Sequence, residues 1–274
     1  MSTDEIIKNI QKGNCFEANC SDSGFYIRIS AYKPWMATAI HDGGGFREEL
    51  KAKTLKSDLQ RWYEEDPCTG QMVCSAPIFL KGLDSRFEYD LNRAPETAVY
   101  ETAWGEQCWK EPLSIEEKER SLAKHSNYYS VLNALLSKLE SEFEKVVLYD
   151  MHSYNWKRHD RKVPEFNIGT VLLDQSKWND EISSWAKHLS AIDIPKNVND
   201  TAINDVFEGK GYQLSQTVEK FKNTLVLATE VSKIYCDELT GEIYEGIVQS
   251  LSDQLAKAME EHAQSYFLKP ERVE

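Results

Sequence analysis

The 274-residue sequence lacks the features of a membrane-bound or exported protein. It contains no apolar run that approaches the roughly 20 residues a membrane helix needs. Its first residues, Met-Ser-Thr-Asp-Glu, do not form the basic and then apolar regions of a signal peptide. The six cysteines are scattered, without a CxxC pair, so we expect free thiols. These absences predict a cytoplasmic protein that does not contact a membrane.

The sequence is also poor in positive charge. Its 32 lysines and arginines face 45 aspartates and glutamates, which gives a formal net charge of -13. This balance argues against a nucleic-acid partner, because such surfaces use Lys and Arg to bind phosphates. The hydrophobic fraction of 41% is ordinary for a globular protein that buries a full core. An anionic small-molecule substrate would therefore need a local positive pocket. The sequence does not reveal the oligomeric state.

Strand-like and helix-like segments alternate along the chain. Apolar or alternating runs predict strands at 25–30, 36–40, 76–80, 85–93, 146–149, 166–170 and 224–231. Helical spacing of apolar residues occurs at 48–65, 114–143, 179–189 and 242–263, and a polar loop is expected at 197–211. This alternation favours an α/β fold, with a mostly parallel mixed sheet and helices on both faces. We predict a single domain over residues 1–274, with residues 1–22 as a candidate peripheral extension.

Two histidines directly follow strand-like runs. His41 precedes three glycines, which allow positive φ and close backbone approach, and His152 ends the run Val-Val-Leu-Tyr-Asp-Met. Parallel strands of an open sheet deliver side chains to one crevice beyond their carboxyl ends. A lone histidine is more often structural, but two at matching strand ends favour a metal site. Catalytic zinc needs three protein ligands, so a carboxylate would complete the set. The candidates are Glu48, Glu49, Asp66 and, less favoured, Asp42. The other histidines are expected to be solvated: His125, His159, His188 and His262.

Glu230 lies near the end of the strongly apolar run 224–231. An unpaired ionised carboxylate buried there would cost several kcal/mol, so such groups are paired, near a metal or protonated. In a partly dry cleft, this glutamate could take a proton from a metal-bound water and pass it to a leaving nitrogen. The structural alternative is an ion pair with Lys233 or Lys222, and the sequence does not separate the two.

Arg86, Asn92 and Arg93 lie close together in the run 85–93. Arginine matches a carboxylate with two parallel hydrogen bonds, which suits a carboxylate-bearing substrate. A structural ion pair with a nearby acid is the more common use of a single arginine. If the run is a strand, seven positions would place Arg86 and Arg93 on opposite faces, with different tasks.

Taken together, these segments resemble the N-formylglutamate amidohydrolases, which are relatives of the zinc carboxypeptidases. The matching segments occur in family order over about residues 35–245. The combination of Asp-Leu-Asn-Arg at 90–93 with Asp-x-His-Ser at 150–153 is the most specific part. The other matching segments are 41–45, Arg86, 166–170 and 230–238.

The resemblance implies a single zinc in a carboxypeptidase-like α/β sandwich, with His41 and His152 as ligands. The acidic position after the family's first helix falls on Asp66, whereas the carboxypeptidase pattern points to Glu48, and we favour Asp66. By the same analogy Glu230 would be the general base and acid. The residues expected to contact the substrate are Arg86, which would polarise the scissile carbonyl, and Asn92, Arg93 and Asn167.

One departure from the family pattern concerns the loop at 207–212. Similar sequences carry an arginine shortly after it, and here none follows, so Lys210 is the candidate substitute. We expect zinc-dependent hydrolysis of the amide bond of an N-formyl- or N-acyl-amino acid. Two alternatives stay open: a carboxypeptidase or peptidoglycan-type amidase acting on short peptides, and a non-catalytic protein that binds carboxylates on the same scaffold.

Overall fold

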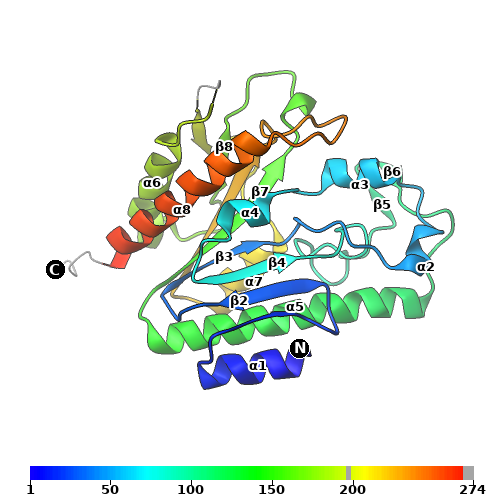
Figure 1. Cartoon of the computed structure of the whole chain (residues 1–274), viewed down its shortest axis with the longest axis horizontal. Coiled ribbons are helices and arrows are strands. Elements are labelled where there is room, and N and C mark those ends of the chain that lie inside the picture. The colour runs from blue at the N-terminus through cyan, green and yellow to red at the C-terminus, as the bar shows by residue number, and fades with distance from the viewer. Residues whose placement is uncertain (196–198, 268–274) are drawn as a thin grey trace.

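A central eight-stranded sheet organises the computed structural model, which describes residues 1–195 and 199–267 (Figure 1). The strand order is β1-β2-β4-β3-β7-β10-β8-β9. The strands are β1 (Phe16–Asn19), β2 (Phe25–Ile29), β3 (Trp35–Ala39), β4 (Ile78–Gly82), β7 (Val146–Tyr154), β8 (Phe166–Gly169), β9 (Thr201–Ile203) and β10 (Thr224–Ser232).

The four central strands β4, β3, β7 and β10 run parallel. β2 and β8 join them antiparallel on either side, so the predicted mostly parallel mixed sheet is confirmed. Their burial explains the sequence pattern, because every residue of β3 and β7 is buried. Parallel strands buried on both faces read as continuous apolar runs. Their carboxyl ends meet at one edge, where His41, His152 and Glu230 lie.

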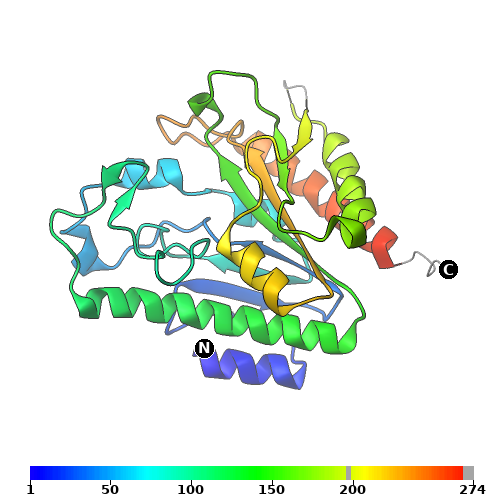
Figure 2. The same ribbon diagram turned by 180° about the vertical axis from the view of Figure 1, so that it is seen from behind.

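Helices cover both faces of the sheet, as predicted. α5 (Ile115–Glu142) and α7 (Tyr212–Lys220) lie on the face seen in Figure 2, and α1 (Thr3–Lys12) packs against α5. The opposite face carries α4 (Thr69–Val73), α6 (Gln175–Ser190) and α8 (Glu245–Phe267). Ile6 and Ile10 of α1 are fully buried in the main core. None of the helices in the described part of the chain is long and apolar enough to cross a bilayer.

The long helix α5 begins where the sequence predicts. Ser114 is its N-cap, and its hydroxyl accepts from the Glu117 amide while the Glu117 carboxylate accepts from the Ser114 amide at 2.8 Å. This capping box satisfies two backbone donors that a helix start otherwise leaves free. The helix then spans the sheet and returns the chain to β7.

Short elements beyond the carboxyl edge of the sheet frame the site. They are α2 (Glu48–Lys51), α3 (Asp58–Glu64), the hairpin β5 (Thr102–Ala103) and β6 (Glu106–Gln107), and the 3-10 turn η1 (Trp156–Arg158). The single helix predicted over 48–65 is wrong, because the segment 52–57 breaks it into α2 and α3. Ser57 caps α3 through a second capping box with Gln60, a signal that the apolar spacing concealed.

The strand predicted over 85–93 is also wrong. The chain turns there, with hydrogen bonds from the Glu88 amide to the Ser85 carbonyl and from the Arg93 amide to the Asp90 carbonyl. The alternation of apolar and polar residues predicted a strand because Phe87 and Leu91 are buried in this turn, as they would be on one face of a strand. The Asp90 carboxylate accepts from the Asn92 amide at 2.6 Å, which stabilises the turn.

Three smaller expectations need correction. Gly43, Gly44 and Gly45 do not have positive φ. The expected close approach is present, since a Cβ on Gly43 would lie 2.2 Å from the Leu83 carbonyl carbon. The predicted loop 197–211 contains β9, and residues 197–198 lie outside the described residues.

His125 and His262 are buried and not solvated. Each lies on the inward face of its helix and hydrogen-bonds to a carbonyl, of Arg93 at 3.0 Å and of Glu181 at 3.0 Å respectively.

Candidate active site

A pocket of about 550 Å³ opens at the carboxyl edge of the parallel strands. Its size is that of a small-molecule site. It is lined by all three residues that were predicted near the ends of β3, β7 and β10, namely His41, His152 and Glu230. Asp66, Arg86, Asn92, Arg93 and Lys210 line it as well. Arg86 and Arg93 therefore share one pocket, because the turn at 85–93 replaces the strand that would have separated them.

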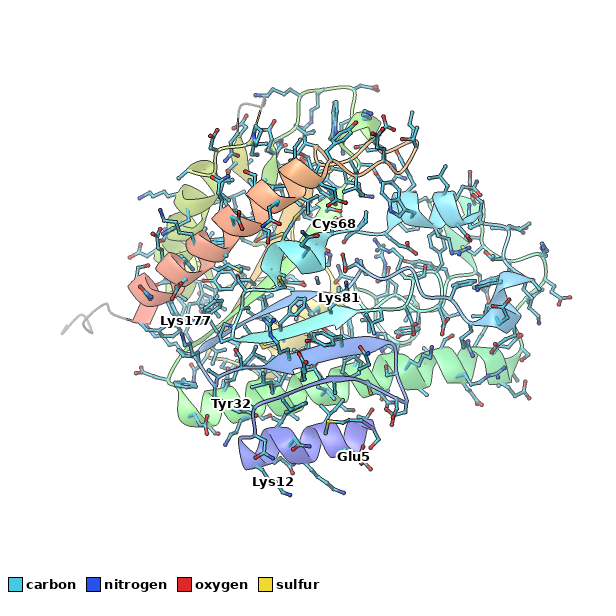
Figure 3. The ribbon with its side chains drawn as sticks, viewed as in Figure 1. Glu5, Lys12, Tyr32, Cys68, Lys81 and Lys177 are labelled. Atoms are coloured by element: carbon cyan, nitrogen blue, oxygen red, sulfur yellow. The ribbon has the colours of Figure 1, made fainter. Side chains whose placement is uncertain are left out.

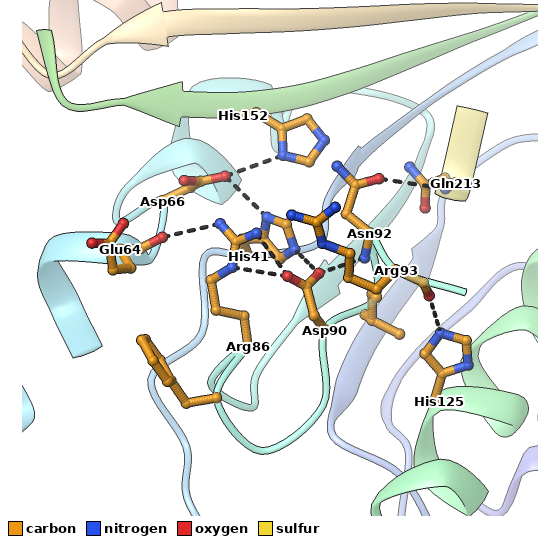
Figure 4. Close-up of polar contacts among 12 residues, drawn as sticks. His41, Glu64, Asp66, Arg86, Asp90, Asn92, Arg93, His125, His152 and Gln213 are labelled. Atoms are coloured by element: carbon orange, nitrogen blue, oxygen red, sulfur yellow. Dashed lines mark hydrogen bonds and ion pairs between the residues drawn. The ribbon is translucent and has the colours of Figure 1, made fainter. Parts of the chain in front are cut away.

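His41, Asp66 and His152 converge in the wall of this pocket (Figure 4). The Asp66 Oδ2 atom lies 3.3 Å from His41 Nδ1 and 3.1 Å from His152 Nδ1. All three side chains are buried. Ligands about 2.0–2.1 Å from a tetrahedral zinc ion are separated by roughly 3.3–3.4 Å from one another. The two distances to Asp66 are close to this spacing, and all three donor atoms lie within 4.8 Å of one another, so the group could hold a metal ion.

Each histidine is held from behind by a second carboxylate. His41 Nε2 lies 2.7 Å from Asp90 Oδ1, and His152 Nε2 lies 3.1 Å from Asp150 Oδ2. A carboxylate that accepts from one ring N–H leaves the other ring nitrogen with a lone pair for a metal. Sequence reasoning did not assign this role to Asp90 or Asp150. The signal for Asp150 is its position two residues before His152, on the same face of β7.

Three buried carboxylates contact the two histidines: those of Asp66, Asp90 and Asp150. Burial would raise the pKa of Asp90, but the charges of Arg86 and His41 hold it well below its ordinary value. Burial would lower the pKa of His152, yet Asp150 and Asp66 raise it well above its ordinary value. The cluster thus stabilises positive charge at its centre, as a cation site requires.

Asp66 is positioned by the backbone that precedes α4. Its amide donates to the His41 carbonyl at 2.9 Å, and the Thr69 hydroxyl donates to the Asp66 carbonyl at 2.7 Å. Cys68, labelled in Figure 3, turns the chain into α4 with a φ of 68°. Lys233, which is buried, donates to the Tyr63 carbonyl at 2.6 Å. This support from separate elements fixes the carboxylate between the two histidines.

Glu230 lies beside His152, because the two residues are paired in the register of β10 and β7. Its side chain is partly open to the pocket, and none of the donors in residues 1–195 and 199–267 hydrogen-bonds to its carboxylate. Burial raises the pKa of Glu230 to about 8, with His152 opposing the shift. Glu230 does not form the alternative ion pair with Lys233 or Lys222. Lys233 donates to the Tyr63 carbonyl, and Lys222 donates to the Val218 carbonyl at 2.9 Å.

Arg86 makes the structural ion pair that the sequence left open. Its Nε and Nη2 atoms donate to Asp90 Oδ2 at 3.1 and 2.7 Å, and Nη1 donates to the Glu64 carbonyl at 3.1 Å. Trp104 lies over the guanidinium, with its ring centroid 5.3 Å from Cζ. These contacts fix the group at the pocket wall and leave guanidinium N–H groups that can still face a ligand.

Asn92 and Arg93 follow the turn and line the pocket. Asn92 Oδ1 accepts from the Gln213 amide at 3.4 Å, so its side chain packs at the start of α7 (Figure 4). The Arg93 carbonyl is held by His125. The Arg93 side chain is exposed and hydrogen-bonds to Tyr100, and none of the acids in the described part of the chain forms an ion pair with it.

The remaining predicted residues lie in different places. Lys210 is at the pocket rim, where it forms an ion pair with Glu208. Asn167 is fully buried and holds the rim loop, since it donates to the Phe207 carbonyl at 2.8 Å and accepts from the Asp205 amide at 2.9 Å. Glu48 is exposed and pairs with Lys51 at 2.8 Å. Glu48 does not line the pocket, so the geometry favours Asp66 as the third donor.

The fold and the pocket define an α/β protein with a buried His-Asp-His cluster at the carboxyl edge of its sheet. The family model of N-formylglutamate amidohydrolase matches residues 33–235. The chain therefore belongs to the N-formylglutamate amidohydrolase family, as its motifs indicated.

Two solved structures show that the fold is shared with other proteins. The N-formylglutamate amidohydrolase from Ralstonia eutropha has a TM-score of 0.68 at 15% identity, and the match covers 89% of this chain and 98% of that one. A gene product of Agrobacterium tumefaciens has a TM-score of 0.69 at 17% identity, covering 89% and 96%. A metallo-carboxypeptidase from Burkholderia cenocepacia is also similar, with a TM-score of 0.43 at 11% identity, covering 96% and 68%. No protein with a curated description matches the chain significantly.

Proposed function

We propose that this protein is a zinc-dependent amidohydrolase that cleaves the amide bond of an N-acyl amino acid and releases a carboxylate and a free amine. The observation that carries the proposal is the convergence of His41, Asp66 and His152, with Glu230 beside them at the pocket wall. The family supports amide hydrolysis, and the pocket volume suits a small molecule.

His41, Asp66 and His152 would hold the metal, and Asp90 and Asp150 would orient the two imidazoles. Zinc bound there would polarise the amide oxygen and lower the pKa of a bound water. The buried carboxylates around the two histidines supply the negative charge that such a cation needs. Two nitrogen donors and one carboxylate also form a common ligand set of catalytic zinc.

Glu230 is the proposed general base and acid. Its carboxylate accepts from none of the donors in the described residues, it opens to the pocket, and its raised pKa suits a group that both takes and returns a proton. It would take the proton of the attacking water and deliver it to the leaving nitrogen, which becomes the free amine. Arg86, fixed by Asp90, would donate to the carbonyl oxygen as negative charge develops on it.

Arg93 and Asn92 are proposed to bind the substrate carboxylate. Arg93 is exposed to the pocket and pairs with none of the acids that the structure describes, and a guanidinium can form two parallel hydrogen bonds to a carboxylate. Asn92 lies next to it on the same turn. We also propose a cytoplasmic location, which agrees with the six free thiols.

The test is hydrolysis of a panel of N-formyl and N-acetyl amino acids, with dipeptides and tripeptides included, by zinc-loaded and chelator-treated protein. We expect chelator-sensitive release of the amine from N-acyl amino acids. Glu230→Gln should retain zinc and lose about 10²–10⁴-fold in kcat. Glu260→Gln on the exposed face of α8 is the matched control and should keep full activity. Preferred cleavage of the longer peptides would favour a carboxypeptidase, and binding without turnover would favour a non-catalytic protein.

A further inference from the structure

The basic side chains of the pocket differ in whether an acidic side chain already pairs with them. Arg158 pairs with Glu64, and Lys210 pairs with Glu208. Just beyond the rim, Arg161 pairs with Asp205 at 2.8 Å. Arg86 is occupied by Asp90 and the Glu64 carbonyl. Within the described residues, this leaves Arg93 as the pocket cation without an acidic partner.

A single guanidinium that lacks an acidic partner in the described residues can bind a single substrate carboxylate. A second carboxylate would have to displace Glu64 from Arg158 or Glu208 from Lys210. Displacing Glu64, whose side chain is 12% exposed, would leave a protein carboxylate unpaired beside the substrate's own negative charge, which is unfavourable in a partly enclosed pocket. The Lys210–Glu208 pair lies in solvent, where Lys210 adds little to carboxylate binding. His159, the remaining basic residue at the mouth, packs its ring against Tyr154 at 6.1 Å. The charge arrangement therefore disfavours substrates that carry two carboxylates.

The rest of the pocket offers apolar surface. Tyr154 and Phe207 pack edge to face, with ring centroids 5.5 Å apart, and Phe207 remains 40% exposed. Val206 and Leu214 line the same pocket. Trp104 is 47% exposed at its edge. Aromatic rings that stay exposed around a pocket provide a surface for an apolar ligand group.

Trp104 is held in a strained conformation. It forms the two-residue turn of the β5–β6 hairpin together with Gly105, and their φ angles are 50° and 81°. Turns of this kind strongly prefer Asn, Asp or Gly, because a bulky residue at positive φ is strained. A tryptophan is therefore poorly suited to the turn itself. Its ring packs against Arg86, Phe87 and Tyr100, and the exposed part of the ring borders the pocket, where it can contact a ligand.

Resting on the proposed function, we infer that the substrate is an N-acyl amino acid whose only charge is its α-carboxylate and whose remaining surface is apolar. Arg93 binds the carboxylate. Trp104 and the Tyr154–Phe207 pair contact the apolar group, which belongs either to the side chain of the amino acid or to the acyl moiety. N-formylglutamate, with its second carboxylate, is a poor substrate by this account.

The experiment compares kcat/KM of the zinc-loaded enzyme for N-formyl-Glu, its neutral isostere N-formyl-Gln, N-formyl-Phe and N-benzoyl-Gly. We expect N-formyl-Gln to exceed N-formyl-Glu, and one or both aromatic compounds to exceed N-formyl-Glu by about tenfold or more, as expected for burying an aromatic group. The aromatic compound that is preferred identifies the side chain or the acyl moiety as the apolar group. N-formyl-Glu as the best substrate would overturn the inference while leaving the amidohydrolase proposal intact.

Binding to zinc-loaded Glu230→Gln separates the two proposals, because it needs no turnover. If the wild-type protein hydrolyses nothing but Glu230→Gln binds the aromatic compounds more tightly than N-formyl-Glu, the selectivity stands and the catalytic proposal fails. Tighter binding of N-formyl-Glu, or no binding of any compound, would overturn the inference.

Two variants test the residues that carry the argument. Trp104→Asn, whose residue suits the turn, should lower kcat/KM for the preferred aromatic compound about tenfold. A lower Tm with unchanged selectivity would assign Trp104 a structural role and contradict the inference. Trp156→Ala, which alters an exposed tryptophan that does not line the pocket, is the matched control.

Glu64→Gln, which releases Arg158, should increase kcat/KM for N-formyl-Glu relative to N-formyl-Gln. A decrease would argue against the role of the rim pairs.

Discussion

Replacing Asp90 by Asn tests whether the carboxylate behind His41 prepares this histidine to bind metal. Asp90 is fully buried and contacts four groups: His41 Nε2, the Arg86 guanidinium, the Tyr100 hydroxyl and the Asn92 amide. Asn keeps the shape and one acceptor oxygen but removes the charge. The variant therefore removes the charge and turns one of the two acceptors into a donor.

The expected magnitudes come from two separate effects. Loss of a carboxylate partner behind a metal-binding histidine costs about 10–100-fold in metal affinity, or about 1.4–2.7 kcal/mol. Arg86 also loses the partner of its buried ion pair, and breaking such a pair costs about 3–5 kcal/mol in stability. Because Asn retains a hydrogen-bond acceptor, we expect a stability loss near the lower end, about 3 kcal/mol.

Zinc affinity is measured by competition with a chromogenic chelator, and stability by urea denaturation of the metal-free protein. Glu88→Gln is a matched control, because Glu88 is equally buried and pairs with Arg47 and Lys124 but does not contact either histidine. The control should lose stability and keep its zinc affinity. If Asp90→Asn binds zinc within about twofold of the wild type, or if both variants lose affinity equally, the orienting role of Asp90 is wrong.

Two further predictions concern Glu230 and the glycines after β3. The pKa of Glu230, raised to about 8 by burial, lies above its unfolded value, so the folded metal-free protein holds a proton that the unfolded chain has already released. The stabilisation that comes from this bound proton is therefore present at pH 4 and is lost as the pH rises toward 8. Glu230→Gln cannot ionise at this position, so in urea titrations of the metal-free proteins it should gain stability relative to the wild type over this range. A stability difference that is constant with pH would contradict the shift. Gly43→Ala should lower the Tm and zinc occupancy, because its Cβ would lie 2.2 Å from the Leu83 backbone, whereas Gly44→Ala, whose nearest neighbour is the Glu65 carboxylate at 3.3 Å, should be tolerated. Equal Tm values for the two variants would exclude the backbone contact as the reason for the glycine.

The residues that sequence reasoning located best are those at strand ends. His41, His152 and Glu230 each come at the end of a continuous apolar run, and parallel strands bring such positions to one edge of the sheet. This argument needs only local patterns and one topological rule. Asp66 required the family resemblance, because its place between the histidines depends on tertiary contacts such as that between Lys233 and the Tyr63 carbonyl.

Other parts of the site could not be read from local patterns. Buried aromatic residues alternate in the turn at 85–93 as they would in a strand, so periodicity alone cannot separate the two. The pairing of Arg158 with Glu64 joins residues 94 positions apart, and no sequence spacing predicts it. The β5–β6 hairpin is too short to produce a detectable alternation, and the tryptophan in its turn departs from the residues that mark such turns.

The most direct test of the central claim is the zinc content of purified variants. The account predicts one zinc per chain in the wild-type protein and in Glu48→Gln, whose side chain is exposed and paired with Lys51. His41→Ala, Asp66→Asn and His152→Ala should each lose zinc while keeping a folded circular dichroism spectrum. Stoichiometric zinc in Asp66→Asn together with its loss in Glu48→Gln, or no zinc in the wild-type protein after zinc loading, would contradict the proposed metal site.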